Sequence, residues 1–185
     1  MDSGAFTASC GGDKTVGEKV LVAYASRFGS TGEVAEVIGK VLAEAGAAVD
    51  VRSVKEVKDL SPYTSVIIGS AAQTGKLLPE AVDFARKHQA DLSHMQTAYF
   101  TVGVAMIEDT PDNRKEAASY LEPLCQIKEP VSLGLFAGKV DPSKYGLVMR
   151  LIFSRVKKGP MAPGDHRNWE AIRAWARELA PQLAG

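Results

Sequence analysis

The sequence lacks the features that mark disulfide-bonded, metal-binding and nucleic-acid-binding proteins. Its 185 residues include only two cysteines, Cys10 and Cys125, and their separation matches no metal motif. The three histidines, His88, His94 and His166, have no partner at ligand spacing, so surface or capping roles are favoured over a metal site. Lys and Arg together number 22, as do Asp and Glu, so no global field draws the molecule to nucleic acid.

Long apolar runs and an N-terminal address are also missing. No stretch reaches the roughly 18 charge-free apolar residues of a spanning helix, and residues 1–17 lack the apolar core of a signal peptide. We therefore expect a cytoplasmic, reducing setting. Residues 1–18 read as a flexible tail because they are rich in Gly, Ser and Thr. The remainder, 19–185, has the length of a single domain, with an insertion at about 139–158.

From Lys19 onward, short apolar runs alternate with helical stripes. Five strands are predicted at Val20–Tyr24, Val49–Val54, Ser65–Gly69, Ala98–Val104 and Val131–Ala137, and helices at Val34–Ala45, Glu80–His88, Asn113–Leu124 and Trp169–Leu183. Strands that alternate with helices pair in parallel through right-handed crossovers. The pattern predicts an α/β three-layer sandwich with a five-stranded, doubly wound parallel sheet. Ligands of such sheets bind beyond the carboxyl ends of the strands.

The loop after the first strand has the composition of a phosphate-binding loop. Its notable residues are Ser26, Arg27, Gly29, Ser30, Thr31 and Gly32. It joins a buried strand to a helix N-terminus, where unpaired N–H groups and the helix dipole attract an anion. Neither G-x-G-x-x-G nor G-K-[ST] is present, which weakens dinucleotide and ATP readings and leaves a mononucleotide phosphate. The alternative is that Ser30 or Thr31 only caps the helix.

This loop and the next carry a family resemblance. Tyr24–Thr31 resembles the FMN phosphate loop of flavodoxins, and Gly69–Lys76 resembles their following flavin loop. The run at 82–88, the strand end Gly134–Lys139 and the insertion after it resemble the flavodoxin-type, menaquinone-dependent protoporphyrinogen dehydrogenase family. The likeness spans Lys19–Leu183, nearly the whole chain.

The resemblance implies a flavodoxin-like fold, an FMN cofactor and a set of residues that hold it. The phosphate would be held by Ser26, Arg27, Phe28, Gly29, Ser30 and Thr31. The flavin ring would lie on Ser70, Ala71, Ala72, Gln73, Thr74, Gly75 and Lys76 together with Thr101, Val102 and Gly103. Gly138 and Lys139 would line the substrate side. No catalytic side chain is expected, because the flavin carries the chemistry.

Neither flavin loop contains an aromatic residue, and neither has an acid before Glu108. Small side chains would leave one face of the ring uncovered, although Phe28 could pack nearby if it is not part of the core. Because charge near the ring tunes a flavin, we expect a less negative hydroquinone potential than in acidic flavodoxins. An open ring and a mild potential suit exchange with a small organic substrate and a quinone.

The insertion is strongly basic. Residues 139–158 hold six Lys and Arg against one Asp, a local charge of 6 − 1 = +5, while the rest of the chain has 16 basic and 21 acidic residues. Within it, residues 145–158 form a short amphipathic helical pattern that fits a peripheral membrane element. Cover for the domain or for a dimer interface is an equal alternative on the residues alone. The family resemblance favours the membrane.

Three functions compete at this stage. The first is an FMN-dependent oxidoreductase between a small organic substrate, protoporphyrinogen IX by resemblance, and a quinone. The second is a non-catalytic electron-transfer protein that docks onto a protein partner. The third is a flavin-free interaction module, because fold alone does not establish function.

Overall fold

The computed structural model describes residues 19–141, 143 and 163–183. The expected tail at 1–18 and the helix expected within 145–158 lie outside these ranges. In chain order the elements are β1 (Lys19–Ala25), α1 (Ser30–Glu44), β2 (Ala48–Ser53), β3 (Ser65–Gln73), β4 (Lys76–Leu77), α2 (Pro79–Lys87), α3 (Gln89–Leu92), β5 (Gln96–Gly103), the 3-10 helix η1 (Val104–Ile107), α4 (Pro111–Tyr120), α5 (Glu122–Cys125), β6 (Ser132–Ala137), β7 (Lys139–Val140), β8 (Gly164–Asp165) and α7 (Trp169–Leu183).

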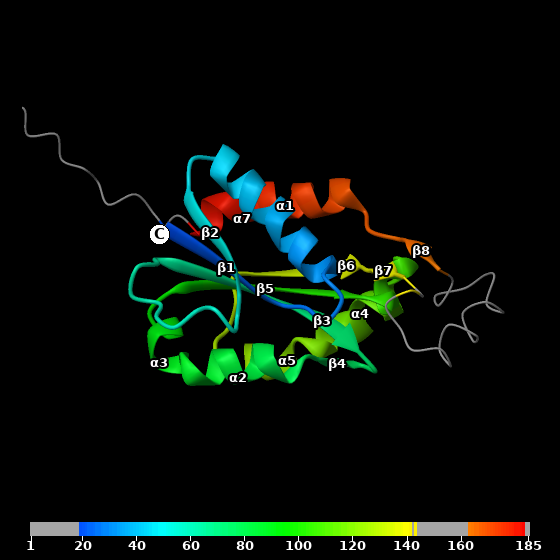
Figure 1. Ribbon diagram of the computed structural model, residues 1–185, viewed down its shortest axis with the longest axis horizontal. Helices are drawn as coiled ribbons and strands as arrows, with labels where there is room; N and C mark the ends of the chain where they lie inside the picture. Colours follow the sequence, from blue (N-terminus) through cyan, green and yellow to red (C-terminus); the bar gives the residue numbers. More distant parts are fainter. Residues whose placement is uncertain (1–18, 142, 144–162, 184–185) are drawn as a thin grey trace, which may run out of the picture.

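Five parallel strands form the main sheet in the order β2-β1-β3-β5-β6. In Figure 1, α1 and α7 cover one face of this sheet, and α2, α3 and α5 cover the other. The predicted three-layer, flavodoxin-like sandwich is therefore confirmed, and β2 lies at one edge of the sheet. The winding reverses between β1 and β3, so the carboxyl ends of these two strands border the crevice where ligands of this architecture bind.

Alternate side chains of each central strand enter two separate apolar layers. In β1, Leu21 and Ala23 pack toward α2 and α3, whereas Val20 and Val22 pack toward α1 and α7. All four are at most 1% exposed. A strand buried on both faces reads as a continuous apolar run, which is the pattern that revealed it in the sequence. The two layers fix the strand ends, and with them the loops of the site.

The helix predicted at Asn113–Leu124 is wrong in its continuity. The structure has α4 and α5 in its place, divided at Leu121. Pro123 lies in the first turn of α5, where its missing N–H has no intrahelical partner to lose. In one continuous helix the same proline would remove a hydrogen bond and clash with the preceding turn.

Two short antiparallel pairings were not predicted, because two-residue strands carry no periodic signal. β4 folds back on the end of β3, with Ala72 opposite Leu77. β7 pairs with β8, with Lys139 opposite Asp165. The second pairing joins the start of the basic insertion to the segment that leads into α7, at the right-hand end of the molecule in Figure 1.

None of the helices within the described ranges has the length and apolar character needed to cross a membrane. Those ranges also contain no group of three or more His, Cys, Asp or Glu residues arranged for a metal ion.

Candidate functional site

The loop between β1 and α1 is built around one backbone conformation rather than around a capping side chain. Gly29 occupies the N-cap position of α1 with φ 95° and ψ −23°, in the left-handed region that favours glycine. Its N–H donates to Ser26 Oγ at 2.9 Å. No side chain caps the helix. The alternative that Ser30 or Thr31 merely caps α1 is therefore wrong, and the N–H groups of the first turn remain available to an anion.

Thr31 is the residue of this loop with a buried, unpartnered hydroxyl that a ligand could bind. Its side chain is fully buried, and its hydroxyl has no hydrogen-bond partner among the described residues. A buried hydroxyl without a partner costs free energy, so native structures rarely retain one unless a ligand or water pairs with it. Thr31 lies in the first turn of α1, beside the N–H groups of the same turn. This donor set fits a phosphate group.

The strand register brings the two expected ring loops to the same edge as the phosphate loop. Ala25 lies opposite Ser70 on β3, and Ser70 lies opposite Thr101 on β5. Gly103 packs so close to Ala72 that an added Cβ would come within 3.0 Å of the alanine methyl. The structure thus brings together all the residues predicted for the phosphate and the ring.

Ser70 and Thr101 use their hydroxyls differently. Ser70 Oγ donates to the Ala71 carbonyl at 2.9 Å and accepts from the Leu78 N–H at 3.0 Å, so it shapes its own loop. Thr101 is 1% exposed, and its Oγ1 has no partner among the described residues. The second unpartnered hydroxyl of the site therefore belongs to the ring loops, and Ser70 contributes there through its backbone.

The second loop ends in a tight reversal. Thr74 and Gly75 both have positive φ, 50° and 76°, as the central residues of a two-residue hairpin turn between β3 and β4 require. Lys76 follows on β4 with its side chain exposed. This part of the loop is a two-residue hairpin, which the sequence analysis did not predict.

Gly138 and Lys139 lie at the same edge, one strand further along. The Gly138 N–H donates to the Gly103 carbonyl at 3.1 Å, and the Gly138 carbonyl accepts from the His166 N–H at 3.2 Å. Lys139 begins β7 with an exposed side chain. Gly138 therefore borders Gly103 of the second ring loop, and the place of Gly138 and Lys139 on the substrate side stays a prediction.

Sequence reasoning missed an aromatic residue at the ring loops. Tyr120 of α4 lies beside Gly75, whose added Cβ would be 3.7 Å from the tyrosine ring. With Val104, Glu108 and Glu116 it lines a hollow of about 290 Å³ next to the end of β5. Burial, together with a hydrogen bond to Glu116, raises the pKa of Tyr120 to about 12. Neither loop contains this ring, so only the fold could bring it there.

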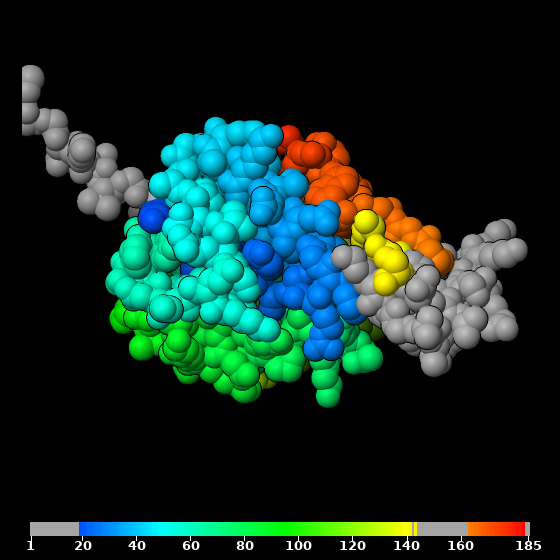
Figure 2. All heavy atoms as spheres, viewed as in Figure 1, coloured from blue at the N-terminus to red at the C-terminus, as the bar shows by residue number. Residues whose placement is uncertain are grey.

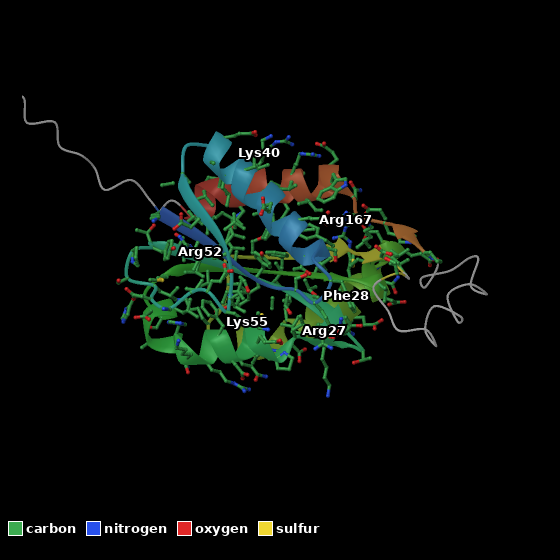
Figure 3. The ribbon with its side chains drawn as sticks, in the orientation of Figure 1. Arg27, Phe28, Lys40, Arg52, Lys55 and Arg167 are labelled. Carbon is green, nitrogen blue, oxygen red and sulfur yellow. The ribbon has the colours of Figure 1, made fainter. Side chains whose placement is uncertain are left out.

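Arg167 was also missed. Its side chain is 3% exposed and joins Glu33, in the first turn of α1, to Asp165 on β8. Figure 3 shows Arg167 between the start of α1 and β8, with Phe28 and Arg27 on the same side of the molecule. Phe28 is half-buried and Arg27 is exposed. The signal in the sequence was a lone acid, Glu33, directly after a phosphate loop.

Of the surface or capping roles expected for His88, the structure supports the capping one, because His88 is the C-cap residue of α2 and the N-cap residue of α3 and is buried. The residue is 6% exposed, at the junction of α2 and α3, with Nδ1 3.5 Å from the Asp91 carboxylate. It packs against the Phe84 ring, with centroids 4.8 Å apart. The start of α7, near His166, is capped by Asn168, whose Oδ1 accepts from the Ala171 N–H at 3.0 Å.

Comparison with known proteins identifies the class to which this fold and site belong. Residues 21–166 match the family described as Flavodoxin domain. Because the match takes in most of the chain, the protein belongs to that family. FMN is accordingly its cofactor, and the unpartnered Thr31 and Thr101 hydroxyls fit such a ligand.

Two curated relatives share one name, and both align with most of this chain. The protoporphyrinogen IX dehydrogenase [quinone] of Escherichia coli (strain K12) is 25% identical over 173 residues, which are 88% of this chain and 94% of that protein. The protein of the same name from Leishmania major is 23% identical over 174 residues, 88% of this chain and 74% of the relative.

Solved structures share the fold. Oxidised flavodoxin 1 from Bacillus cereus has a TM-score of 0.58 and 18% sequence identity, over 90% of this chain and 99% of that one. A flavodoxin from the domain Archaea has a TM-score of 0.57 and 17% identity, with the same coverage of both chains.

Proposed function

We propose that the protein is an FMN-dependent dehydrogenase that removes hydrogen from a small organic substrate and transfers it to a quinone. The substrate that the relatives' names support is protoporphyrinogen IX. The observation that carries this proposal is the likeness to these dehydrogenases over 88% of the chain. Bound FMN would accept electrons from the substrate and yield them to the quinone.

The chain's own part in this reaction is to bind, orient and leave access. The first-turn N–H groups of α1, with Ser26, Arg27 and Ser30 around them, would receive the phosphate, and the Thr31 hydroxyl would donate its unused hydrogen bond. Ser70–Lys76 would hold the ring from one side. Thr101, Val102 and Gly103 would hold it from the other.

Access to the ring follows from the small residues of these loops. Ala71, Ala72 and Gly103 leave room for an organic molecule to stack against the flavin. The exposed Lys139 and the backbone of Gly138 stand at the neighbouring strand end, and Lys139 offers a positive charge to an acidic group on the substrate. We infer that the substrate enters from this side.

We also propose, from composition alone, that residues 145–158 make peripheral contact with an anionic membrane surface, at its inner face, where a quinone acceptor would be reached. In this proposal residues 19–185 form a single domain, and residues 145–158 are its membrane-contacting segment. Sedimentation with anionic liposomes at low salt tests it, and a protein that remains entirely in the supernatant would remove it.

The central experiment uses FMN-loaded protein, photoreduced without oxygen and then mixed with a menaquinone analogue. We expect reoxidation of the bound flavin to be saturable in quinone and anaerobic protoporphyrinogen to reduce the flavin again. Porphyrin fluorescence should grow only as about three quinones are consumed for each protoporphyrinogen, because aromatisation removes six electrons and the flavin carries two at a time. Free FMN at the same concentration is the control, because a reduced flavin in solution also reacts with quinones. Simple second-order kinetics at the free-flavin rate would contradict a substrate site.

The same preparation separates the competing functions. A colourless protein that stays colourless after incubation with excess FMN would leave only a flavin-free module. A flavin that ignores both quinone and protoporphyrinogen, and whose hydroquinone potential is very negative, would instead indicate an electron carrier that docks onto a protein partner. We expect the milder potential.

A further inference from the structure

A buried arginine connects the start of α1 to the base of the basic insertion. The Arg167 side chain is 3% exposed. Its Nη1 donates to Glu33 Oε2 at 2.7 Å, while Nε and Nη2 donate to the two Asp165 oxygens at 2.8 and 2.6 Å. The guanidinium also lies 4.3 Å from the centre of the Trp169 ring. One cation therefore serves two carboxylates from segments more than a hundred residues apart.

The position of Glu33 gives this arrangement a consequence for a bound phosphate. Glu33 lies in the first turn of α1, and its N–H donates to the carbonyl of Gly29 at 3.1 Å. An acid in this turn stabilises a free helix through the dipole. A phosphate bound at the same helix end is a dianion, and the Glu33 carboxylate would repel it unless a cation compensates.

The charges around this point come from several elements. Glu33 and Glu36 lie on α1, and both line the hollow beside Gly29 and Trp169. Asp165 on β8 faces Lys139 on β7. Arg167 is the cation that contacts Glu33, and the pKa of Arg167 is raised by its hydrogen bonds to Asp165 and Glu33. In Figure 2 the orange residues of this segment lie beside the blue start of α1.

We propose that Arg167 is a positioning residue for FMN: it neutralises Glu33 so that the start of α1 accepts the phosphate, and it holds that turn to the β7–β8 pair. The inference rests on FMN binding at Ser26–Thr31 and is independent of the substrate and the acceptor. It assigns to a residue of the 163–169 segment a role in recognising the phosphate rather than the ring.

The test compares FMN with riboflavin, which lacks the phosphate. In the apoprotein, Arg167→Gln leaves Glu33 uncompensated, so we expect FMN affinity to fall about two- to fivefold while riboflavin affinity is unchanged. Glu33→Gln combined with Arg167→Gln should restore the ratio of FMN to riboflavin affinity. The defect of Arg167→Gln should shrink at 0.5 M salt, because screening weakens the repulsion. Affinities are read from quenching of flavin fluorescence.

Arg167→Lys keeps the positive charge and loses the planar set of guanidinium N–H donors. This variant still tests the proposal if Arg167→Gln folds poorly. It should bind FMN within about twofold of the parent if charge is what matters. Arg177→Gln is the matched control, because Arg177 pairs with Glu170 at 3.3 Å on the exposed face of α7 and should leave both ligands unaffected.

Three results would overturn the proposal. They are equal losses for FMN and riboflavin in Arg167→Gln, no rescue in the double variant, or a loss in Arg167→Lys as large as in Arg167→Gln. Each would make the contact an ordinary structural tie. Failure of the parent protein to bind FMN would be a different outcome, because it would remove the cofactor assignment itself.

Discussion

At the scale of single residues, the candidate site is characterised by two buried threonine hydroxyls that have no hydrogen-bond partner among the described residues. Thr31 and Thr101 are both buried with unpartnered hydroxyl oxygens, and the other unpartnered buried side-chain atom among the described residues is His88 Nε2, at the junction of α2 and α3. Ser70, a residue with the same kind of side chain, is satisfied twice by its own loop. The contrast separates hydroxyls that are free to bind a ligand from a hydroxyl that is used within the fold.

Replacement of Thr31 by valine tests this distinction. The variant keeps the shape and removes the hydroxyl, so we expect FMN affinity to fall about ten- to a hundredfold, as for loss of a hydrogen bond to a charged group. The apoprotein should become no less stable, because an unpaired buried hydroxyl has been removed. Fluorescence titration and thermal unfolding of the apoprotein measure the two effects.

Thr97→Val is the control for that experiment. Its Oγ1 already donates to the Glu129 carbonyl at 3.4 Å, away from the site. It should lower stability and leave FMN affinity alone. A Thr31→Val protein that binds FMN normally but unfolds more easily would show that the Thr31 hydroxyl has a structural partner.

At the scale of elements, α1 carries most of the phosphate site, and glycines in left-handed conformations stand just outside both its ends. Gly29 precedes it with φ 95°, and Gly46 follows it with φ 103°. An added Cβ would meet nothing within 4 Å at either position. The two glycines therefore have the same conformational demand and differ in function, since only Gly29 belongs to the phosphate loop.

This symmetry makes a matched pair of variants. Gly29→Ala and Gly46→Ala should each lower the free energy of unfolding of the apoprotein by about 1–2 kcal/mol, because the left-handed region is strained for alanine. Only Gly29→Ala should also weaken FMN binding, since relaxing φ there redirects the first-turn N–H groups. Urea unfolding and FMN titration measure both, and equal FMN binding in the two variants would contradict the loop geometry.

At the scale of the whole molecule, two carboxylates make charged contacts in different sheets: Asp50 on β2 of the main sheet and Asp165 on β8 of the β7–β8 pair. Asp50 on β2 accepts from Tyr63 Oη at 2.7 Å and lies 3.1 Å from Lys19 Nζ, and these contacts lower its pKa. On β8, the hydrogen bonds from Arg167 lower the pKa of Asp165. Both groups are better acids in the folded protein than in the unfolded chain.

A lowered folded-state pKa stabilises the fold above the unfolded pKa, and this stabilisation disappears as the pH falls through the folded value. We therefore expect the apoprotein's free energy of unfolding to decrease below about pH 4, the ordinary range of an aspartate. Asp165→Asn should flatten part of this decrease. Glu178→Gln, an exposed acid of α7, is the control and should leave it unchanged. Parallel pH profiles for the parent and Asp165→Asn would contradict the role of the Arg167 contact.

The sequence by itself determined the layered α/β fold, the order of its elements and the phosphate loop, but it ended the third strand at Gly69, whereas β3 continues to Gln73. Buried strands and amphipathic helices leave periodic signals, and a cluster of Gly, Ser and Thr between them is local chemistry. The sequence pattern did not predict the division between α4 and α5 at Leu121, and strands of two residues such as β4 and β7 are too short to show a periodic pattern.

Only the tertiary structure brought Tyr120 beside Gly75 and Arg167 onto Glu33, because these partners are distant in the chain and no periodicity relates them. It also decided which hydroxyls have partners within the fold, since Ser70 and Thr101 carry the same functional group and differ in what surrounds them. Local pattern specifies elements, whereas the pairing of distant polar groups depends on how the sheet positions its loops.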